Sequence, residues 1–177
     1  DAKAMKALEP ALKDDLPGGI FFKNEMHVNT FELMNALQMA LVPLNVPVMT
    51  GNPVAAVKRV NGEYHIAVKE KTYVCKKLVI AAGAWSDQIL NMLGLSLPMT
   101  AVKGQMMIAQ ATDTVIQRPV FYRGGYIVPR FGFEILAGST LEPDNYNKNF
   151  TFFGAHAITE SLAKVAPQIL KLPVEKT

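Results

Sequence analysis

The sequence predicts an α+β protein in which a mixed or antiparallel sheet with helices accompanies part of a three-layer α/β domain. Residues 78–82, Leu-Val-Ile-Ala-Ala, form an unbroken apolar run that is typical of a strand buried on both faces. Residues 54–77 alternate with a period of two, and residues 98–140 carry several short strand patterns separated by turns. Two stretches with helical spacing, residues 29–42 and 153–165, supply the helices.

Length and composition predict a globular protein with one sizeable domain or two small ones. The chain has 177 residues, half of them hydrophobic, so it can form a real core. Its net charge of +3 is small and its basic residues are scattered, so we expect no nucleic-acid surface. We also expect no membrane span, because no apolar run approaches about 20 residues. The single cysteine, Cys75, cannot form an internal disulfide and favours the cytosol.

The first 50 residues predict two helices and two short strands. Met5, Leu8 and Leu12 have helical spacing, and a short strand is expected over residues 20–22. Asn29 is the predicted N-cap of the next helix, and Glu32 completes a capping box. The apolar stripe of that helix is expected to be buried, and Pro43 ends it. Residues 46–50 are predicted to form the following strand. The stripe consists of Leu33, Met34, Leu37, Ala40 and Leu41.

A three-stranded meander is predicted between residues 54 and 76. Residues 54–60 and 64–68 alternate, and Asn61-Gly62 between them is a strong two-residue hairpin turn. Residues 72–76 form the third strand and lead into the apolar run at Leu78. The order of helix, strand, meander and buried strand matches the second half of a dinucleotide-binding domain.

A tight turn and a helix follow the apolar run. Gly83 breaks the strand, Ser86 is the predicted N-cap, and Gly94 is placed to close the helix. Ligands lie at the carboxyl ends of strands in open α/β sheets, where a glycine lets backbone approach them closely. The alternative is ordinary α/β construction without a ligand.

The second half of the chain predicts antiparallel strands and one helix. The glycine pair Gly124-Gly125 and the dipeptide Phe131-Gly132 are read as turns between neighbouring strands. The helix is expected to end before Pro167. The predicted strands are residues 98–109, 120–122, 126–130 and 133–140, and a polar loop covers residues 142–149.

Several common active-site motifs are absent from these residues. No two glycines are separated by a single residue, so there is no Gly-x-Gly-x-x-Gly turn to cradle a pyrophosphate. His27, His65 and His156 lie in different predicted elements, so we expect no metal site. Neither a Gly-x-Ser-x-Gly elbow nor a Walker loop occurs.

Three segments together carry a family resemblance. Ala-Ala-Gly-Ala-Trp-Ser at residues 81–86, Leu-Gly-Leu-Ser-Leu-Pro at 93–98 and Val-Lys-Gly-Gln at 102–105 resemble the flavin-dependent amine oxidases of the D-amino-acid oxidase superfamily, and the glycine oxidase branch most of all. The resemblance covers nearly the whole chain. It implies that residues 28–95 are the rear half of an FAD-binding domain, and that residues 1–27 and 96–177 form a substrate-binding domain.

The resemblance also implies cofactor contacts. Val54 falls where the family's backbone contacts the adenine part of FAD, and Ala82, Gly83 and Trp85 match the turn that packs near the cofactor. The chain opens at Asp1 without a methionine, so we expect it to be a piece of a longer parent. FAD is then expected in the full-length parent, while the isolated 177 residues are expected to lack it and to be inactive.

The resemblance implies two substrate-binding residues, and a third is a candidate on chemical grounds. Tyr126 matches a tyrosine that faces the substrate carboxylate, and Leu141 matches an apolar residue beside the pocket. Tyr126 has the alternative role of an ordinary strand aromatic. Arg130 is a candidate because arginine can grip a carboxylate with two hydrogen bonds. We discount Arg130, since the family uses an arginine in a Gly-Leu-Arg-Pro segment that these residues lack.

The reaction implied by the resemblance is oxidation of a small amino acid. Glycine, sarcosine or a small D-amino acid would give the imino or oxo acid, ammonia or an amine, and hydrogen peroxide. The cofactor performs the chemistry, so no catalytic acid or base is predicted. The alternatives are a D-amino-acid dehydrogenase, a sarcosine oxidase, or a catalytically silent binding or assembly module. Exposed sheet edges are expected to favour a homo-oligomer.

Overall fold

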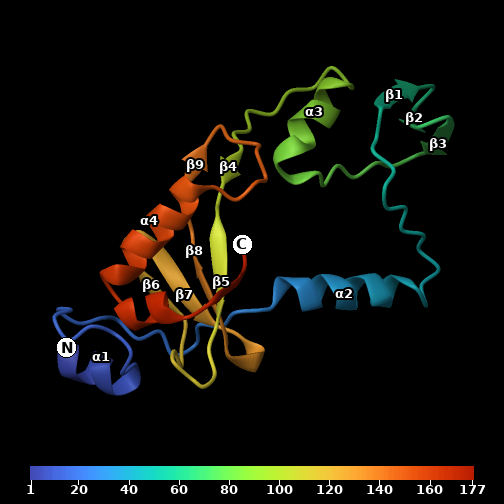
Figure 1. Ribbon diagram of the computed structural model, residues 1–177. Coiled ribbons are helices and arrows are strands. Elements are labelled where there is room, and N and C mark those ends of the chain that lie inside the picture. Colours follow the sequence, from blue (N-terminus) through green and yellow to red (C-terminus); the bar gives the residue numbers. More distant parts are fainter. The chain divides into compact units, whose positions relative to one another are not determined.

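The computed structural model describes residues 1–177, which divide into two compact units (Figure 1). Unit 1 comprises residues 1–29 and 102–177, and unit 2 comprises residues 30–101. Both units contain helices, and every strand pair in the three sheets is antiparallel. The predicted α+β class is therefore confirmed. None of the helices has the length and apolar character required to cross a membrane.

Unit 1 is built on a five-stranded sheet with the order β10-β5-β8-β7-β6. Each strand runs antiparallel to its neighbours, and a separate ribbon pairs β4 with β9. Short turns join β6 to β7 and β7 to β8, so three neighbouring strands are consecutive in the chain. The strands are β4 (Val102–Lys103), β5 (Met106–Gln110), β6 (Val120–Tyr122), β7 (Gly125–Pro129), β8 (Glu134–Gly138), β9 (Glu142–Pro143) and β10 (Val174–Lys176).

Helices cover one face of this sheet. Helix α4 (Phe152–Ala163) is capped by Thr151, whose side chain accepts a hydrogen bond from the Gly154 amide at 3.1 Å. The 3-10 turn η3 (Pro167–Lys171) follows it, and η2 (Phe131–Phe133) lies between β7 and β8. Helix α1 (Ala2–Leu8) begins at the chain start, where the Asp1 side chain accepts from the Ala4 amide at 2.8 Å.

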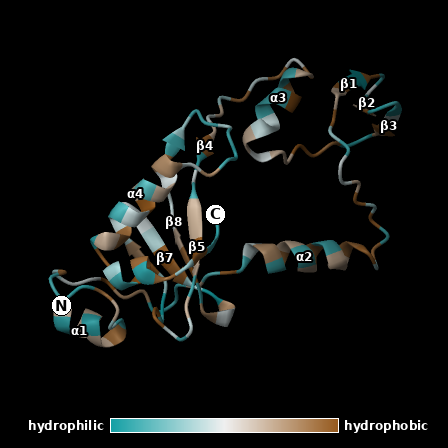
Figure 2. Cartoon of the chain, viewed as in Figure 1, coloured by the Kyte–Doolittle hydropathy of each residue, from teal (hydrophilic) through white to brown (hydrophobic).

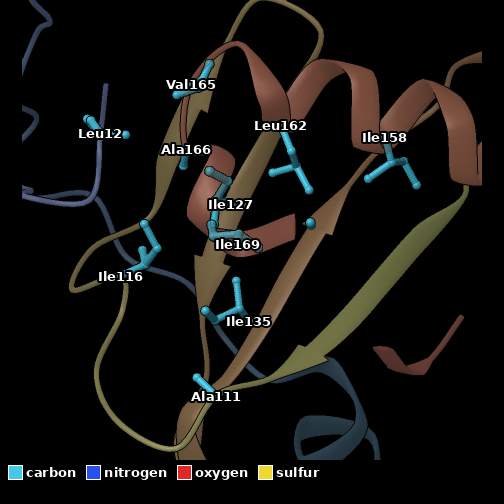
Figure 3. Close-up of a cluster of buried hydrophobic side chains, with 11 residues drawn as sticks. Leu12, Ala111, Ile116, Ile127, Ile135, Ile158, Leu162, Val165, Ala166 and Ile169 are labelled. Carbon is cyan, nitrogen blue, oxygen red and sulfur yellow. The ribbon is translucent and has the colours of Figure 1, made fainter. Parts of the chain in front are cut away.

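The core of unit 1 lies between the sheet and α4. Figure 3 shows Ile158 and Leu162 of α4 gathered with Ile127 and Ile135 of the sheet. Ile127 is completely buried, and the others are 2–3% exposed. Burying side chains of this size contributes about 1.5–3 kcal/mol each. Leu12, Ala111, Ile116, Ala137, Val165, Ala166 and Ile169 complete the cluster.

A buried carboxylate ties the N-terminal segment to the rest of unit 1. Glu9 is 4% exposed, and its Oε2 accepts hydrogen bonds from the backbone amides of Gln117 at 2.9 Å and Arg118 at 3.0 Å. The Arg118 guanidinium also donates to the carbonyl of Leu8 at 2.5 Å. Residues that are more than 100 positions apart in the sequence are thereby held together.

Unit 2 contains the predicted meander and hairpin. Val60 of β1 pairs with Glu63 of β2 across Asn61 and Gly62, which have φ angles of 49° and 86°. Two positive φ angles are the signature of a type I′ turn, and the two-residue hairpin turn that the sequence predicts is therefore confirmed. The elements are α2 (Thr30–Leu41), β1 (Ala56–Val60), β2 (Glu63–Val68), β3 (Lys71–Cys75), η1 (Gly83–Trp85) and α3 (Ser86–Asn91).

The buried strand predicted over residues 78–82 is wrong for this chain. These residues form no strand, and Val79 is 87% exposed. A parallel strand exists only where neighbouring strands pair with its backbone, and no strand among these 177 residues pairs with this run. The short strands predicted at residues 20–22 and 46–50 are also absent, and they too have no partner strand.

The predicted strand over residues 98–109 is broken into two parts. Val102 and Lys103 pair with β9, whereas β5 pairs with β8 and β10. Gly104 and Gln105 lie between the two parts. The strand breaks here because each part pairs with a different partner strand. Residues 142–149 were expected to be only a polar loop, but β9 begins there.

Helix α2 forms as predicted, but its apolar stripe is not buried. Leu33, Met34 and Leu37 are 43%, 53% and 51% exposed. Figure 2 shows apolar residues recurring along α2. The N-cap prediction for α3 is also wrong: Ser86 is the first residue of that helix, and Trp85 is the N-cap. The Ser86 hydroxyl instead accepts a hydrogen bond from the Ala82 amide at 3.1 Å.

Candidate functional site

The face of the unit 1 sheet opposite the core carries the first candidate site. Successive side chains of a strand point to opposite faces, so Tyr126 lies on the other side of β7 from the buried Ile127. The strand register places Phe121, Tyr126, Gly138 and Met106 in one row across β6, β7, β8 and β5. Phe121 is 68% exposed and Met106 is 42% exposed. We call this partly exposed row the Tyr126 row.

Gly138 lets two side chains meet above the sheet. The Tyr126 hydroxyl donates a hydrogen bond to Sδ of Met106 at 3.0 Å, across the position of Gly138. A Cβ at Gly138 would lie 2.9 Å from Cγ of Met106 and 3.3 Å from the Tyr126 oxygen. Any side chain there would displace one of them. The rings of Phe121 and Tyr126 lie 6.0 Å apart and are tilted by 51°, a favourable aromatic arrangement.

Leu141 lies at the same end of the sheet as Tyr126. Tyr126 pairs with Gly138 at the end of β8, and Leu141 follows three residues later. Thr140 before it is 7% exposed, while Leu141 itself is 80% exposed. Leu141 therefore exposes an apolar side chain immediately after a buried residue.

Arg130 lies at the other end of β7. It lies four positions along the chain from Tyr126, a span of about 13 Å. Its guanidinium forms an ion pair with Glu134 at 3.6 Å, and its side chain is 13% exposed. Lys176 approaches the same carboxylate at 3.6 Å. The structure does not bring Arg130 together with Tyr126 and Leu141, and a substrate carboxylate would have to compete with Glu134.

A buried polar cluster lies beside Leu141. Gln105 is 4% exposed and donates from Nε2 to Oε1 of Glu142 at 2.6 Å. The Thr140 hydroxyl donates to the same Oε1 at 2.7 Å. These hydrogen bonds, from Gln105 first and then Thr140, lower the pKa of Glu142, and the charge of Lys103 adds to them. Glu142 is therefore held as a carboxylate, and it accepts hydrogen bonds on both oxygens.

The second candidate site is the turn in unit 2. Gly83 has a φ of 55°, and a Cβ placed there would meet no atom within 4 Å. Ala82 and Trp85 belong to the same turn, and Trp85 is 39% exposed. Val54 lies elsewhere in the unit, just before β1, and is 36% exposed. The backbone at Gly83 is therefore open to close approach by a ligand.

The residues present fit one part of a dinucleotide cofactor and not another. Open backbone at Gly83 suits a ring, whereas a pyrophosphate needs several amides at a glycine-rich helix start. Within these 177 residues no such glycine spacing occurs. The structure contains no group of three or more His, Cys, Asp and Glu side chains that could hold a metal ion.

Sequence reasoning missed Phe121, Met106, Gly138 and Gln105. The first three join Tyr126 only through the strand register, which spans residues 106 to 138 and is not visible in the local pattern. A weak signal was present, because a glycine inside a strand often marks a close approach. Gln105 was noticed only as part of the Val-Lys-Gly-Gln segment.

Known proteins resemble this chain over much of its length. A family model described as FAD dependent oxidoreductase (DAO) matches residues 1–177. The glycine oxidase of Pseudomonas aeruginosa is 39% identical over 93 residues, which cover 52% of this chain and 26% of that protein. The glycine oxidase of Pseudomonas putida is 28% identical over 171 residues, which cover 96% of this chain and 47% of that protein. The chain spans about half the length, or less, of the curated relatives it matches.

Solved structures show the same fold. The glycine oxidase of Geobacillus kaustophilus superposes with a TM-score of 0.92 at 24% identity, covering 98% of this chain and 47% of that one. The L-proline dehydrogenase of P. horikoshii superposes with a TM-score of 0.81 at 18% identity, covering 99% of this chain and 49% of that one. At these identities the likeness establishes the fold alone.

Proposed function

This chain belongs to the FAD-dependent oxidoreductase family whose model matches its whole length, and on that basis we propose that it is part of a flavin-dependent amine oxidase. The proposed substrates are glycine, sarcosine and small D-amino acids. Relatives named glycine oxidase, with up to 39% identity, support this choice of substrate class. The homo-oligomeric state expected from the exposed apolar surface is part of the proposal.

The Tyr126 row is the observation that carries the proposal. The Tyr126 hydroxyl now donates to a thioether sulfur, which is a weak acceptor. A carboxylate is a much stronger acceptor, so a bound amino acid would draw this hydrogen bond to itself. Tyr126 would then anchor the substrate carboxylate. Phe121 and Met106 flank it with apolar surface, which leaves room for a small substituent and disfavours a polar one.

The substrate would be held between a polar anchor and apolar walls. Leu141, exposed at the same end of the sheet as Tyr126, would form one wall of the pocket. Apolar walls exclude water from the bound amine and favour its neutral form, which carries the lone pair that oxidation requires. Arg130 remains a weaker proposal for carboxylate binding because Glu134 already occupies its guanidinium.

FAD, when bound, accepts two electrons from the amine and delivers them to oxygen. In unit 2, Ala82, Gly83 and Trp85 are the residues proposed to lie against it, and Val54 is proposed to contact its adenine end. Their contribution is orientation, since none of these side chains carries an acid or base.

The experiment uses the full-length protein that contains these residues, purified with its flavin. We expect hydrogen peroxide on addition of glycine, sarcosine or D-alanine, and we expect Tyr126→Phe to raise KM by about tenfold, because one charge-assisted hydrogen bond is lost. Reduction of an artificial electron acceptor without peroxide would indicate a dehydrogenase instead. Absence of both reactions with all three substrates would refute the proposal.

A further inference from the structure

We propose that Gln105 is a positioning residue that holds Leu141 in place and thereby sets the size selectivity of the substrate pocket. The proposal rests on the function proposed above, in which Leu141 borders the substrate. Gln105 itself does not reach the Tyr126 row, because its side chain is buried in the polar cluster with Glu142 and Thr151.

The side chain of Gln105 is fully hydrogen-bonded. Its Oε1 accepts from the backbone amide of Thr151 at 2.7 Å, and its Nε2 donates to Oε1 of Glu142 at 2.6 Å and to the Thr151 hydroxyl at 3.0 Å. A backbone amide can only donate and a carboxylate can only accept. The two partners therefore fix the orientation of the Gln105 amide, and rotation by 180° would break both hydrogen bonds.

Three separate segments meet at this amide. The backbone of Gln105 also exchanges two hydrogen bonds with Thr140, from its amide to Oγ1 at 2.9 Å and from the Thr140 amide to its carbonyl at 3.2 Å. Gln105 thus joins the break between β4 and β5, the link from β8 to β9, and the N-terminus of α4. Gly154 of α4 makes room for it, since a Cβ there would lie 2.4 Å from Oε1 of Gln105.

Leu141 stands between two residues that Gln105 holds. Thr140 on one side and Glu142 on the other are both hydrogen-bonded to Gln105, and to each other at 2.7 Å. Leu141 is 80% exposed, so little packing of its own can fix its position. An exposed apolar side chain on a backbone held by a buried polar cluster is the arrangement expected of a preorganised pocket wall.

The test compares two variants with a matched control in the full-length flavin-loaded protein. Gln105→Glu keeps the size of the side chain but sets a second carboxylate 2.6 Å from that of Glu142, so the pair is disrupted. Adding Glu142→Gln restores one amide and one carboxylate with their places exchanged, while the Thr140 hydroxyl, which donates to Oε1 of Glu142, loses that acceptor. Gln110→Glu is the control: Gln110 lies at the other end of β5 and donates to the carbonyls of Ala111 and Gly132.

Two readouts are needed. Hydrogen exchange of the Thr140 and Thr151 amides reports the cluster directly and needs no activity. The ratio of kcat/KM for glycine to that for D-alanine reports the pocket. For Gln105→Glu we expect exchange at least about tenfold faster and a preference changed about fivefold, mainly through KM. The double variant should reverse both changes in part, and Gln110→Glu should change neither.

The outcomes separate this proposal from the function on which it rests. Faster exchange in Gln105→Glu with an unchanged glycine preference would overturn the positioning role, because the wall would have moved without effect. Unchanged exchange would overturn it too, because the cluster would not depend on Gln105. A wild-type protein that oxidises none of these amines would instead refute the proposed function.

Discussion

Replacing Gly154 by alanine is expected to destabilise unit 1, although alanine is the better helix former. The change alone should gain up to about 1 kcal/mol of helix propensity. The new Cβ, however, would lie 2.4 Å, 2.5 Å and 2.8 Å from Oε1, Cδ and Nε2 of Gln105. The amide must move away, and its hydrogen bonds to Glu142 and to the Thr151 amide are then lost.

The expected magnitude has two parts. The Thr151 amide loses its partner in a part-buried site, at a cost of about 1–3 kcal/mol. Crowding of the new Cβ against Gln105 costs about 1–3 kcal/mol more. After subtraction of the helix gain of up to about 1 kcal/mol, the net loss is roughly 1–5 kcal/mol. Since about 1.4 kcal/mol corresponds to a factor of ten, amide exchange through opening of unit 1 should accelerate roughly 5- to 4,000-fold.

Native-state hydrogen exchange of the buried Ile158 and Leu162 amides in α4 is the assay. It reports unit 1 without interference from unit 2. His156→Ala, at an exposed position of the same helix, is the control and should change the opening free energy by less than about 0.5 kcal/mol. Slower exchange in Gly154→Ala would refute the reasoning. In a Gln105→Ala background the new Cβ at position 154 has room, so Gly154→Ala should become neutral or stabilising.

Three further predictions concern other parts of the chain. Gly62→Ala should lower the thermal stability of the meander by about 1–2 kcal/mol, because the residue has a φ of 86°, and an unchanged transition by circular dichroism would contradict this. Hydrogen bonds keep the pKa of Glu142 below its ordinary 4.5, so unfolding free energy should fall as pH drops through that folded-state pKa. Glu142→Gln should remove this dependence in urea titrations, and its persistence would exclude Glu142 as the cause. Burial raises the pKa of Tyr122 above 10.0 despite a hydrogen bond from Ser161, so stability should fall as pH rises above 10.0. Tyr122→Phe should reduce this loss of stability in urea titrations above pH 10.0, and its full persistence would assign it to another residue.

Elements fixed by neighbouring residues could be predicted from the sequence. The Asn61-Gly62 turn, helix α2 and strand β6 depend on local chain chemistry and pairing across two residues, and they form as predicted. Strand β7 begins within one residue of its predicted start. Turn geometry and helical periodicity act over a few residues, so a single sequence contains what they need.

Elements that need distant partners were predicted poorly. Residues 78–82 have the composition of a buried strand, but composition cannot supply the neighbouring strands that such a strand requires. The pairing of β4 with β9 joins residues about 40 positions apart, and it is this pairing that splits the expected long strand.

The candidate site shows the same contrast between local signals, which the sequence contains, and contacts between distant segments, which it does not. Tyr126 and Leu141 were found through a family resemblance, whereas Phe121 and Met106 follow only from the strand register. Gln105 contacts residues 35 to 46 positions away, and no local pattern marks a glutamine as buried and fully hydrogen-bonded. Side-chain networks between distant segments are what the sequence alone leaves undetermined.

The most direct test of the central claim is the absorbance of the flavin in the full-length protein, recorded without oxygen as glycine is added. If these residues form the substrate side of an amine oxidase, the flavin bands should bleach, and Tyr126→Phe should require about tenfold more glycine for the same effect. Flavin bands that stay unchanged with glycine, sarcosine and D-alanine alike would contradict the account.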